Sequence, residues 1–373
     1  MRYSLASGGY DYQFRNIGST DNKGVEFSIR GVILDHRAKD LSYGLTVDAN
    51  ISYNHNTVVD LGGMDTYPVS GQCFSSYYAQ AYEYNLTPGS MIGDVWGYKT
   101  DGWYTASDFA SFNSSNRTGY GWYNADGEKI STPLGEAYPG MVKIVDTNGD
   151  GTIDAKDMVK IGNTMPVVNG GFNVGFHIGG EKWGKLDLAA NFTYSIGNDV
   201  VNMTALDYTM VCSSTDHRNL LAANGYGLRY SMFDENGAFI PMDGYNYVSN
   251  VISGEEYVAM ASRLDEANAN AVVANPTVTN TVLTDKFVED ASYLRLSSLT
   301  FGYSLAQKWI KKAHISQCRI FFSASNLFCV TNYSGADPEV DTRSKINPLA
   351  TGMDFAAFPK SRTFNFGINL SFE

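Results

Sequence analysis

The final strand-forming segment of this chain restricts its fold more than any other feature. Residues 363–372 alternate strictly between two kinds of side chain, and one parity holds Phe364, Phe366, Ile368, Leu370 and Phe372. Because successive side chains of a strand point to opposite faces, the segment has one apolar and one polar face. A transmembrane β-strand needs about ten such residues, with lipid on one side and water on the other. The segment therefore predicts a membrane-crossing strand, with the last strand of a soluble sandwich as the alternative.

The same alternation recurs along the chain. It predicts a hairpin from 172–178 and 186–194, joined by a turn at 179–182, and a further strand over 43–53. In 293–305 the apolar parity changes, which predicts a β-bulge near Ser297 and Ser298. Several of these strands are nearly twice the roughly five or six residues usual in soluble proteins, so their length favours a membrane barrel. The other expected strands cover 24–32, 95–104, 141–145 and 317–330.

The connections between the expected strands differ strongly in length. Some have a few residues, whereas 53–92, 105–140 and 198–286 are long and polar. Short turns at one end and long loops at the other are typical of an antiparallel transmembrane β-barrel whose long loops are extracellular. Short helices are expected at 259–271 and 307–312. No apolar stretch reaches the roughly 18 residues of a membrane helix.

The composition agrees with many strands joined by turns. Aromatic residues make up 13% of the chain, charged residues only 18%, and there are 37 glycines. The net charge of −12 argues against a nucleic-acid partner. The cysteines lack metal-ligand spacing and are interpreted as small apolar residues or an incidental pair; they are Cys73, Cys212, Cys318 and Cys329.

The sharpest local motif is the segment 146–157, DTNGDGTIDAKD. It has oxygen-bearing side chains at positions 1, 3, 5, 9 and 12, with glycine at position 6, which is the pattern of a calcium loop. Calcium takes about six to eight oxygen ligands. The motif predicts a Ca²⁺ or Mg²⁺ site, and a metal-free turn is the alternative. The expected ligands are Asp146, Asn148, Asp150, the Thr152 carbonyl, Asp154 and Asp157.

Two details of this segment limit its role. Asp157 stands where calcium loops usually have the longer glutamate, which weakens the case for bidentate ligation. Amphipathic helices do not flank the segment, so we expect the metal to pin a hairpin and not to drive a conformational switch.

No catalytic constellation stands out, so the chain is predicted not to be an enzyme and to have no organic cofactor. The five histidines form neither a metalloprotease nor a serine-hydrolase motif; they are His36, His55, His177, His217 and His314. No single carboxylate pair suggests a glycosidase. The aromatic clusters at 96–104 and 120–123 are expected either to stack on sugars or to pack within a girdle or loops.

Several segments, in order along the whole chain, resemble the SusC/RagA family of TonB-linked (TonB-dependent) outer-membrane proteins of Bacteroidetes. Four of them are NIGSTDNKGVEF at 16–27, GYKTDG at 97–102, FVEDASYLRL at 287–296 and YSGADPEV at 333–340. The others are 146–157, 161–166, 171–173, 197–199, 325–328 and 358–364.

The resemblance implies that residues 1–373 are the C-terminal part of a 22-stranded barrel, without the plug and N-terminal domains. Such proteins import oligosaccharides or peptides, work with a SusD-like lipoprotein and draw energy from the TonB system. Residues 1–8 lack the apolar core of an export signal, so the chain is expected to derive from a longer precursor or a truncated gene. Because unpaired strand edges are not tolerated in lipid, we do not expect this chain to transport alone.

Two other functional classes remain as alternatives. One is a soluble, calcium-pinned, β-rich domain that binds glycans; solubility without detergent would distinguish it from a membrane strand sheet. The other is a secreted glycan hydrolase, which needs two carboxylates close together in a cleft.

Overall fold

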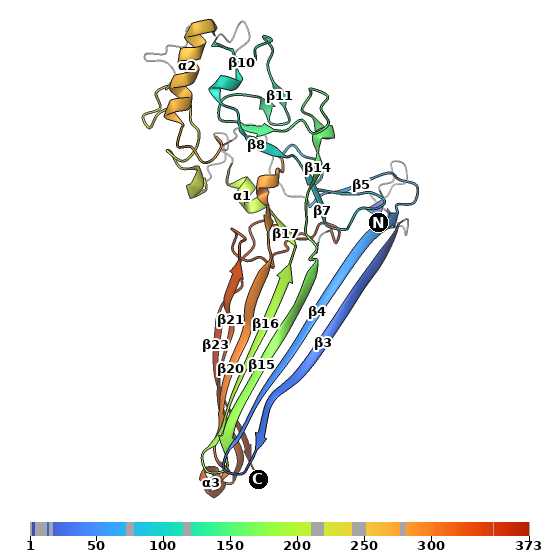
Figure 1. The fold of residues 1–373 in the computed structure, drawn as a ribbon, viewed down its shortest axis with the longest axis vertical. Helices are drawn as coiled ribbons and strands as arrows, with labels where there is room; N and C mark the ends of the chain where they lie inside the picture. Colours follow the sequence, from blue (N-terminus) through green and yellow to red (C-terminus); the bar gives the residue numbers. More distant parts are fainter. Residues whose placement is uncertain are drawn as a thin grey trace.

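The chain is divided into a long sheet and a packed region at one end of it (Figure 1). The computed structural model describes residues 2–3, 13–14, 18–71, 78–114, 121–209, 220–240, 251–276, 281–345 and 347–372. We call the seven-stranded sheet "the sheet". We call the three long connections that gather beyond it "the head", and these are residues 61–167, 197–292 and 332–362.

The sheet is antiparallel throughout, with strand order β23-β21-β20-β16-β15-β4-β3. This confirms the antiparallel all-β prediction and the hairpin, whose turn is 181–183. The expected β-bulge is also confirmed, because the pairing of β20 with β21 shifts between Leu296 and Ser298. The strands are β3 (Ser19–Arg37), β4 (Ser42–Asp60), β15 (Val168–Gly180), β16 (Gly184–Ile196), β20 (Tyr293–Ser304), β21 (Ile315–Thr331) and β23 (Thr363–Phe372).

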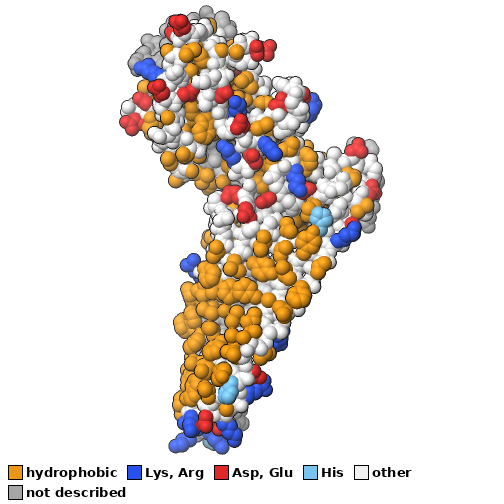
Figure 2. Space-filling view, viewed as in Figure 1, with side chains coloured by type: hydrophobic (Ala, Val, Ile, Leu, Met, Phe, Trp, Pro, Cys, Tyr) orange, Lys and Arg blue, Asp and Glu red, His pale blue; other side chains and the backbone are white. Residues whose placement is uncertain are grey.

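The register of the sheet aligns apolar side chains into rows that cross all seven strands. One row of directly paired residues runs Phe366, Phe322, Phe301, Leu188, Phe176, Leu45 and Leu34. Phe366 is 82% exposed and Phe301 47% exposed. Figure 2 shows the resulting apolar surface over the sheet. We call it "the outer face".

The opposite face of the sheet, "the wet face", is lined by polar residues. Here a row of paired residues runs Thr363, Ser325, Ser298, Asn191, Asn173, Asp48 and Arg30. Because a slip by one residue would exchange the two faces, these registers fix which face is apolar.

The unequal connections predicted from the sequence lie at opposite ends of the sheet (Figure 1). At the "turn end", residues 38–41, 181–183 and 305–314 connect neighbouring strands. The last of these contains α3 (Gln307–Ile310) and η5 (Lys311–Ala313), which confirms the predicted helical turn at 307–312. The longer connections lie at the other end and form the head. None of the helices in the described ranges is long and apolar enough to span a membrane.

The head corrects the expectation that the long connections are mainly polar loops. It has its own apolar cores, in which Tyr84, Leu264 and Leu283 are fully buried. The single strand expected over 95–104 is also wrong: it is the two strands β7 (Asp94–Gly97) and β8 (Thr100–Trp103). The helix expected at 259–271 begins and ends earlier, as α2 (Gly254–Ala267). Alternation of side chains shows which face of a strand is apolar. It does not show which short apolar segments, far apart in the sequence, will pack together into a core.

The remaining elements are short. Outside the head, β1 (Arg2–Tyr3) pairs with β2 (Gln13–Phe14). The first head connection contains β5 (Tyr67–Val69), β6 (Tyr84–Leu86), η1 (Ala106–Asp108), β9 (Ser111–Asn113), β10 (Gly121–Tyr123), β11 (Ser131–Thr132), β12 (Gly135–Glu136), β13 (Val142–Ile144), η2 (Ala155–Asp157) and β14 (Val159–Asn163). The other two contain β17 (Asp199–Asn202), α1 (Met203–Asp207), η3 (Ala222–Asn224), β18 (Val251–Ser253), η4 (Asp285–Phe287), β19 (Val288–Asp290) and β22 (Met353–Asp354).

Candidate functional site

The wet face carries a network of neutral hydrogen bonds between strands. The Asn191 side-chain amide donates to the Ser298 hydroxyl at 2.7 Å, and the Asn173 amide donates to Asn191. The hydroxyls of Thr193 and Ser297 lie 2.8 Å apart. Such side chains tolerate water on the side away from their neighbours, as the lumen of a transmembrane barrel requires. The wet face is therefore chemically suited to line an aqueous passage.

A cluster of charges lies where the wet face meets the head. Arg295 of β20 is 4% exposed, and its Nη2 atom lies 2.6 Å from Oδ1 of Asp337. Its Nε atom forms an ion pair with Oε2 of Glu339 at 2.7 Å, and Lys360 Nζ donates a hydrogen bond to that oxygen at 2.6 Å. A buried guanidinium requires such partners, because an unpaired buried charge is strongly unfavourable. The cluster attaches the 332–362 connection to the sheet.

The charges of this cluster also act on the ionisation of Glu339. Burial by itself raises the pKa of this carboxyl, but hydrogen bonds from Lys360 and Tyr293 and the charges of Lys360 and Arg295 outweigh it. The net effect is a pKa below the ordinary value for glutamate. The segments that hold this cluster carry the family resemblance. However, Arg295 and its partner Asp337 lie about 40 positions apart, and no local sequence pattern predicts that they pair.

The predicted calcium segment lies between β13 and β14 and ends in η2. The two carboxylate oxygens of Asp146 accept from the backbone N–H groups of Gly149 and Gly151, at 2.6 and 2.8 Å. The Asn148 side-chain oxygen accepts from Asp150 N–H at 2.8 Å, and Asp150 accepts from Thr152 N–H at 2.9 Å. Local hydrogen bonds therefore hold three of the expected ligands in one tight turn.

The remaining expected ligands with charged side chains, Asp154 and Asp157, form other contacts. Asp157 is fully buried, and its two oxygens accept from the N–H groups of Thr147 and Asp154 at 2.8 Å each. Burial raises the pKa of the Asp157 carboxyl, but these backbone hydrogen bonds lower it further than burial raises it. Lys156 Nζ lies 3.5 Å from Asp154 and 3.8 Å from Asp150. Within the described ranges, no three side chains of the types His, Cys, Asp and Glu converge as a metal group.

The donor chemistry of the segment fits a hard cation, even though the carboxylates do not converge. Each carboxylate oxygen can accept more than one partner, so the backbone bonds leave lone pairs available. Asn148 and the Thr152 carbonyl add oxygen donors of the kind that calcium prefers. The metal site therefore stays a prediction.

The aromatic clusters that could have stacked on sugars are packed within the head. Tyr98, Tyr104 and Trp122 are at most 5% exposed, and the Trp122 ring lies 4.5 Å from that of Phe112 between centroids. Tyr120 lies outside the described residues. These buried aromatic side chains stabilise the fold of the head.

The chain matches no family model. It is 27% identical over 367 residues to TonB-dependent receptor P3 of Formosa agariphila, covering 98% of this chain and 30% of that protein. It is 25% identical over 361 residues to TonB-dependent receptor SusC of Bacteroides thetaiotaomicron, covering 96% of this chain and 27% of that protein. Among solved structures, the RagAB peptide transporter matches with a TM-score of 0.61 and 19% identity, over 98% of this chain and 31% of that chain.

These comparisons confirm the resemblance indicated by the sequence segments. Over nearly its whole length, the chain is similar to TonB-dependent receptors, including SusC, and its fold is that of a part of the RagAB transporter chain. The relatives are receptors and transporters, not enzymes, in agreement with the prediction that this chain is not an enzyme. The chain spans about 30% of the length of the curated relatives it matches.

Proposed function

We propose that this chain contributes wall strands and outer loops to a TonB-dependent importer of the bacterial outer membrane. The outer face carries the proposal: a continuous apolar row crosses seven strands, and side chains such as Phe366 remain 82% exposed. Fully burying one such side chain is worth about 1.5–3 kcal/mol. Contact with lipid tails supplies that burial, and the wet face opposite then borders the passage.

The sheet requires further strands to close. In the described part of the chain, β3 and β23 each pair with one neighbouring strand of the sheet. An unpaired edge in lipid leaves backbone groups without partners, which the bilayer does not tolerate. We therefore propose that transport requires a larger barrel, and that the sheet alone is not competent for it.

The substrate and partners follow by analogy with the relatives. The SusC/RagA resemblance implies an oligosaccharide or a peptide as cargo, and the similarity to the RagAB peptide transporter supports the peptide. They also support a SusD-like lipoprotein at the head and a TonB system as the energy source. The neutral hydrogen-bonding side chains of the wet face, such as Asn173 and Asn191, are compatible with either cargo, since both present amide or hydroxyl groups.

Uptake in the source organism tests this proposal. Deleting the whole gene should abolish growth on either oligosaccharides or peptides as the limiting nutrient, and restoring the gene should recover it. The protein should also fractionate with the outer membrane and require detergent for extraction. A protein that is released into water without detergent, or growth that is unchanged on both nutrient classes, would contradict the proposal.

We also propose that residues 146–157 bind Ca²⁺ and pin the connection between β13 and β14. The turn that holds Asp146, Asn148 and Asp150 supports this role. In the full-length protein, calcium should protect this segment from protease. The double variant Asp146→Ala/Asp150→Ala should lose that protection, whereas Asp126→Ala/Glu128→Ala, in an exposed turn of the head, should keep it. Equal cleavage of the unmodified protein with and without calcium would end the proposal.

A further inference from the structure

The turn end of the sheet is basic in a chain that is otherwise acidic. Its three connections, taken with the adjoining strand residues as 35–42, 179–187 and 304–319, hold eight Lys and Arg residues and four Asp and Glu residues, whereas the whole chain has a net charge of −12. Figure 2 shows the blue cluster at this tip, beyond the apolar surface of the sheet. The excess of positive charge is therefore concentrated at one end of the strands.

Most of the acidic groups there are already engaged by a neighbour. Arg37 lies 3.0 Å from Asp35, Lys182 lies 3.4 Å from Asp40, and Arg319 lies 2.5 Å from Asp187. Within the part of the chain that the structure describes, five lysines of this end have no carboxylate within ion-pair distance, namely Lys39, Lys185, Lys308, Lys311 and Lys312. All five are exposed.

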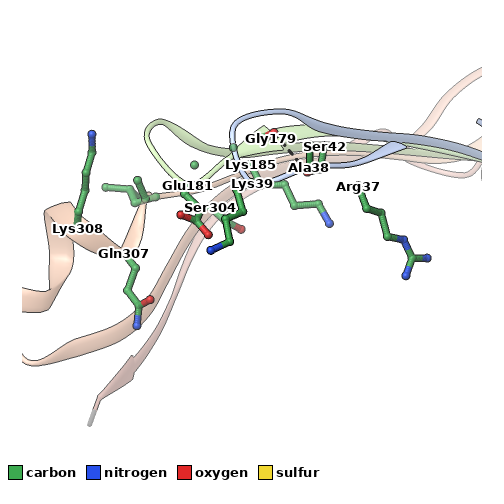
Figure 3. A pocket seen from close by; sticks show the side chains of 14 residues that line it. Arg37, Ala38, Lys39, Ser42, Gly179, Glu181, Lys185, Ser304, Gln307 and Lys308 are labelled. Atoms are coloured by element: carbon green, nitrogen blue, oxygen red, sulfur yellow. Dashed lines mark hydrogen bonds between the residues drawn. The ribbon is translucent and has the colours of Figure 1, made fainter. Parts of the chain in front are cut away.

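The three turns converge around one shallow hollow. It has a volume of about 820 Å³ and is lined by residues of all three connections, including Arg37, Lys39, Lys185 and Lys308 (Figure 3). Basic side chains from segments far apart in the sequence thus surround a common space. Such an arrangement favours several negative charges spread over a surface, because each lysine is a point charge on a flexible stem.

Tryptophans mark the same level of the molecule. Of the five tryptophans, the two outside the head are Trp183 and Trp309, and both lie at the turn end. Trp309 is 50% exposed, whereas its neighbour Ile310 is 8% exposed and holds α3 in place. Tryptophan prefers the boundary between lipid tails and headgroups, and nearby lysines extend their charges into the headgroup layer. The turn end, where the apolar outer face stops, therefore has the residue types of a membrane interface.

We propose that the turn end is a docking surface for anionic phospholipid headgroups of the leaflet that it faces, with α3 and η5 supplying three of its lysines. This inference rests on the proposed membrane function. Its occupant is assigned from charge complementarity and from the continuity of the basic cluster with the apolar outer face. Each lysine near an anionic membrane surface contributes about 1 kcal/mol, which corresponds to about a fivefold preference for charged over neutral lipid.

The test uses the full-length protein in vesicles of phosphatidylcholine mixed with phosphatidylglycerol in equal amounts. The protein is extracted gently and the two lipids that it retains are counted by mass spectrometry. The wild type should be enriched in phosphatidylglycerol. The variant Lys308→Gln/Lys311→Gln/Lys312→Gln should lose about tenfold or more of this enrichment, and so should the wild type in concentrated salt, because exposed charges are screened.

Two control variants separate charge at this site from charge in general. Lys99→Gln/Lys286→Gln/Lys345→Gln removes three exposed lysines of the head and should keep the enrichment. Lys308→Arg/Lys311→Arg/Lys312→Arg keeps the charge and should also keep it. Equal enrichment in the Gln variant of α3 and in the wild type would overturn the lipid assignment.

Two further outcomes distinguish this inference from the proposed function. Insertion into the vesicles without any preference for phosphatidylglycerol would contradict the docking surface alone. Failure to float with vesicles of any composition would contradict the membrane function and the docking surface together.

Discussion

The sheet and the head solve opposite problems with similar amino acids. In the sheet, Phe366 and Ile368 are 82% and 63% exposed, whereas in the head Tyr84 and Leu264 are fully buried. The sheet has its polar groups on one face and its apolar groups on the other. The head instead gathers apolar side chains inside and polar groups outside. The difference is the one that the proposed membrane function requires, with lipid around the sheet and water around the head, since apolar surface is then removed from water in both cases.

The head is stabilised by a buried apolar core, as a soluble domain is. Removing a core side chain should therefore have the largest effect on stability among these predictions. Leu264→Ala in α2 creates a cavity at a fully buried position and should lower the free energy of unfolding of the head by about 2–5 kcal/mol. Hydrogen exchange of the α2 amides in the full-length protein measures it. Val258→Ala lies on the same helix, where the side chain is 63% exposed, and should change it by less than about 0.5 kcal/mol. Equal effects would mean that the head has no water-excluding core.

A charged side chain is tolerated at most exposed positions of a soluble protein, but it should destabilise this protein when it lies on the exposed outer face of the sheet. Phe301→Arg places a charge on the outer face and should destabilise the protein in vesicles by about 2–4 kcal/mol near the bilayer centre, falling toward the interfaces. Thr300→Arg, at the preceding residue, places the same charge on the wet face and should destabilise the protein far less. Denaturant titration of the reconstituted protein compares the two variants. A greater loss for Thr300→Arg would reverse the assignment of the two faces.

A buried carboxyl in the head provides the smallest effect. Burial raises the pKa of Glu83, although its Oε2 atom accepts from Gly71 N–H at 2.8 Å. A raised pKa in the folded state means that stability is highest below the unfolded pKa, about 4.5, and falls as pH rises through the folded pKa. Each unit of the rise costs about 1.4 kcal/mol at higher pH.

Glu83→Gln should therefore gain stability relative to the wild type as pH rises, and the gain should be largest near neutral pH. Hydrogen exchange measures the stability of the head at pH values from about 4 to about 8, roughly the range in which a carboxyl with a raised pKa titrates. The matched change Glu128→Gln, at an exposed turn, should leave the dependence unchanged. A stability difference between Glu83→Gln and the wild type that stays constant or shrinks as pH rises would contradict the assigned direction.

The strands of the sheet were predictable because their signal is local. Alternation with a period of two identifies 363–372 and the 172–194 hairpin from neighbouring residues alone, and the parity change in 293–305 locates the β-bulge. The head was less predictable, because its strands are only two to five residues long and their burial depends on partners far away in the sequence. The single strand expected at 95–104 was wrong for that reason.

The candidate sites divide in the same way. The ligand pattern of 146–157 is readable as a motif, since its hydrogen bonds form within one turn. The Arg295 cluster is not, because its partner Asp337 lies 42 positions along the chain and meets it only after the 332–362 connection folds back. The basic turn end likewise requires three separate turns to converge.

The sequence by itself determined that this protein has long two-faced strands, unequal connections and one oxygen-rich loop. These properties depend on residues a few positions apart, whose relative directions the backbone geometry dictates. Only the tertiary structure decided which strands are neighbours, which apolar segments form the head's cores and which charges meet. Those outcomes depend on contacts between segments that are distant in the sequence. Such contacts stabilise the fold only after the chain has met the entropic cost of bringing the segments together.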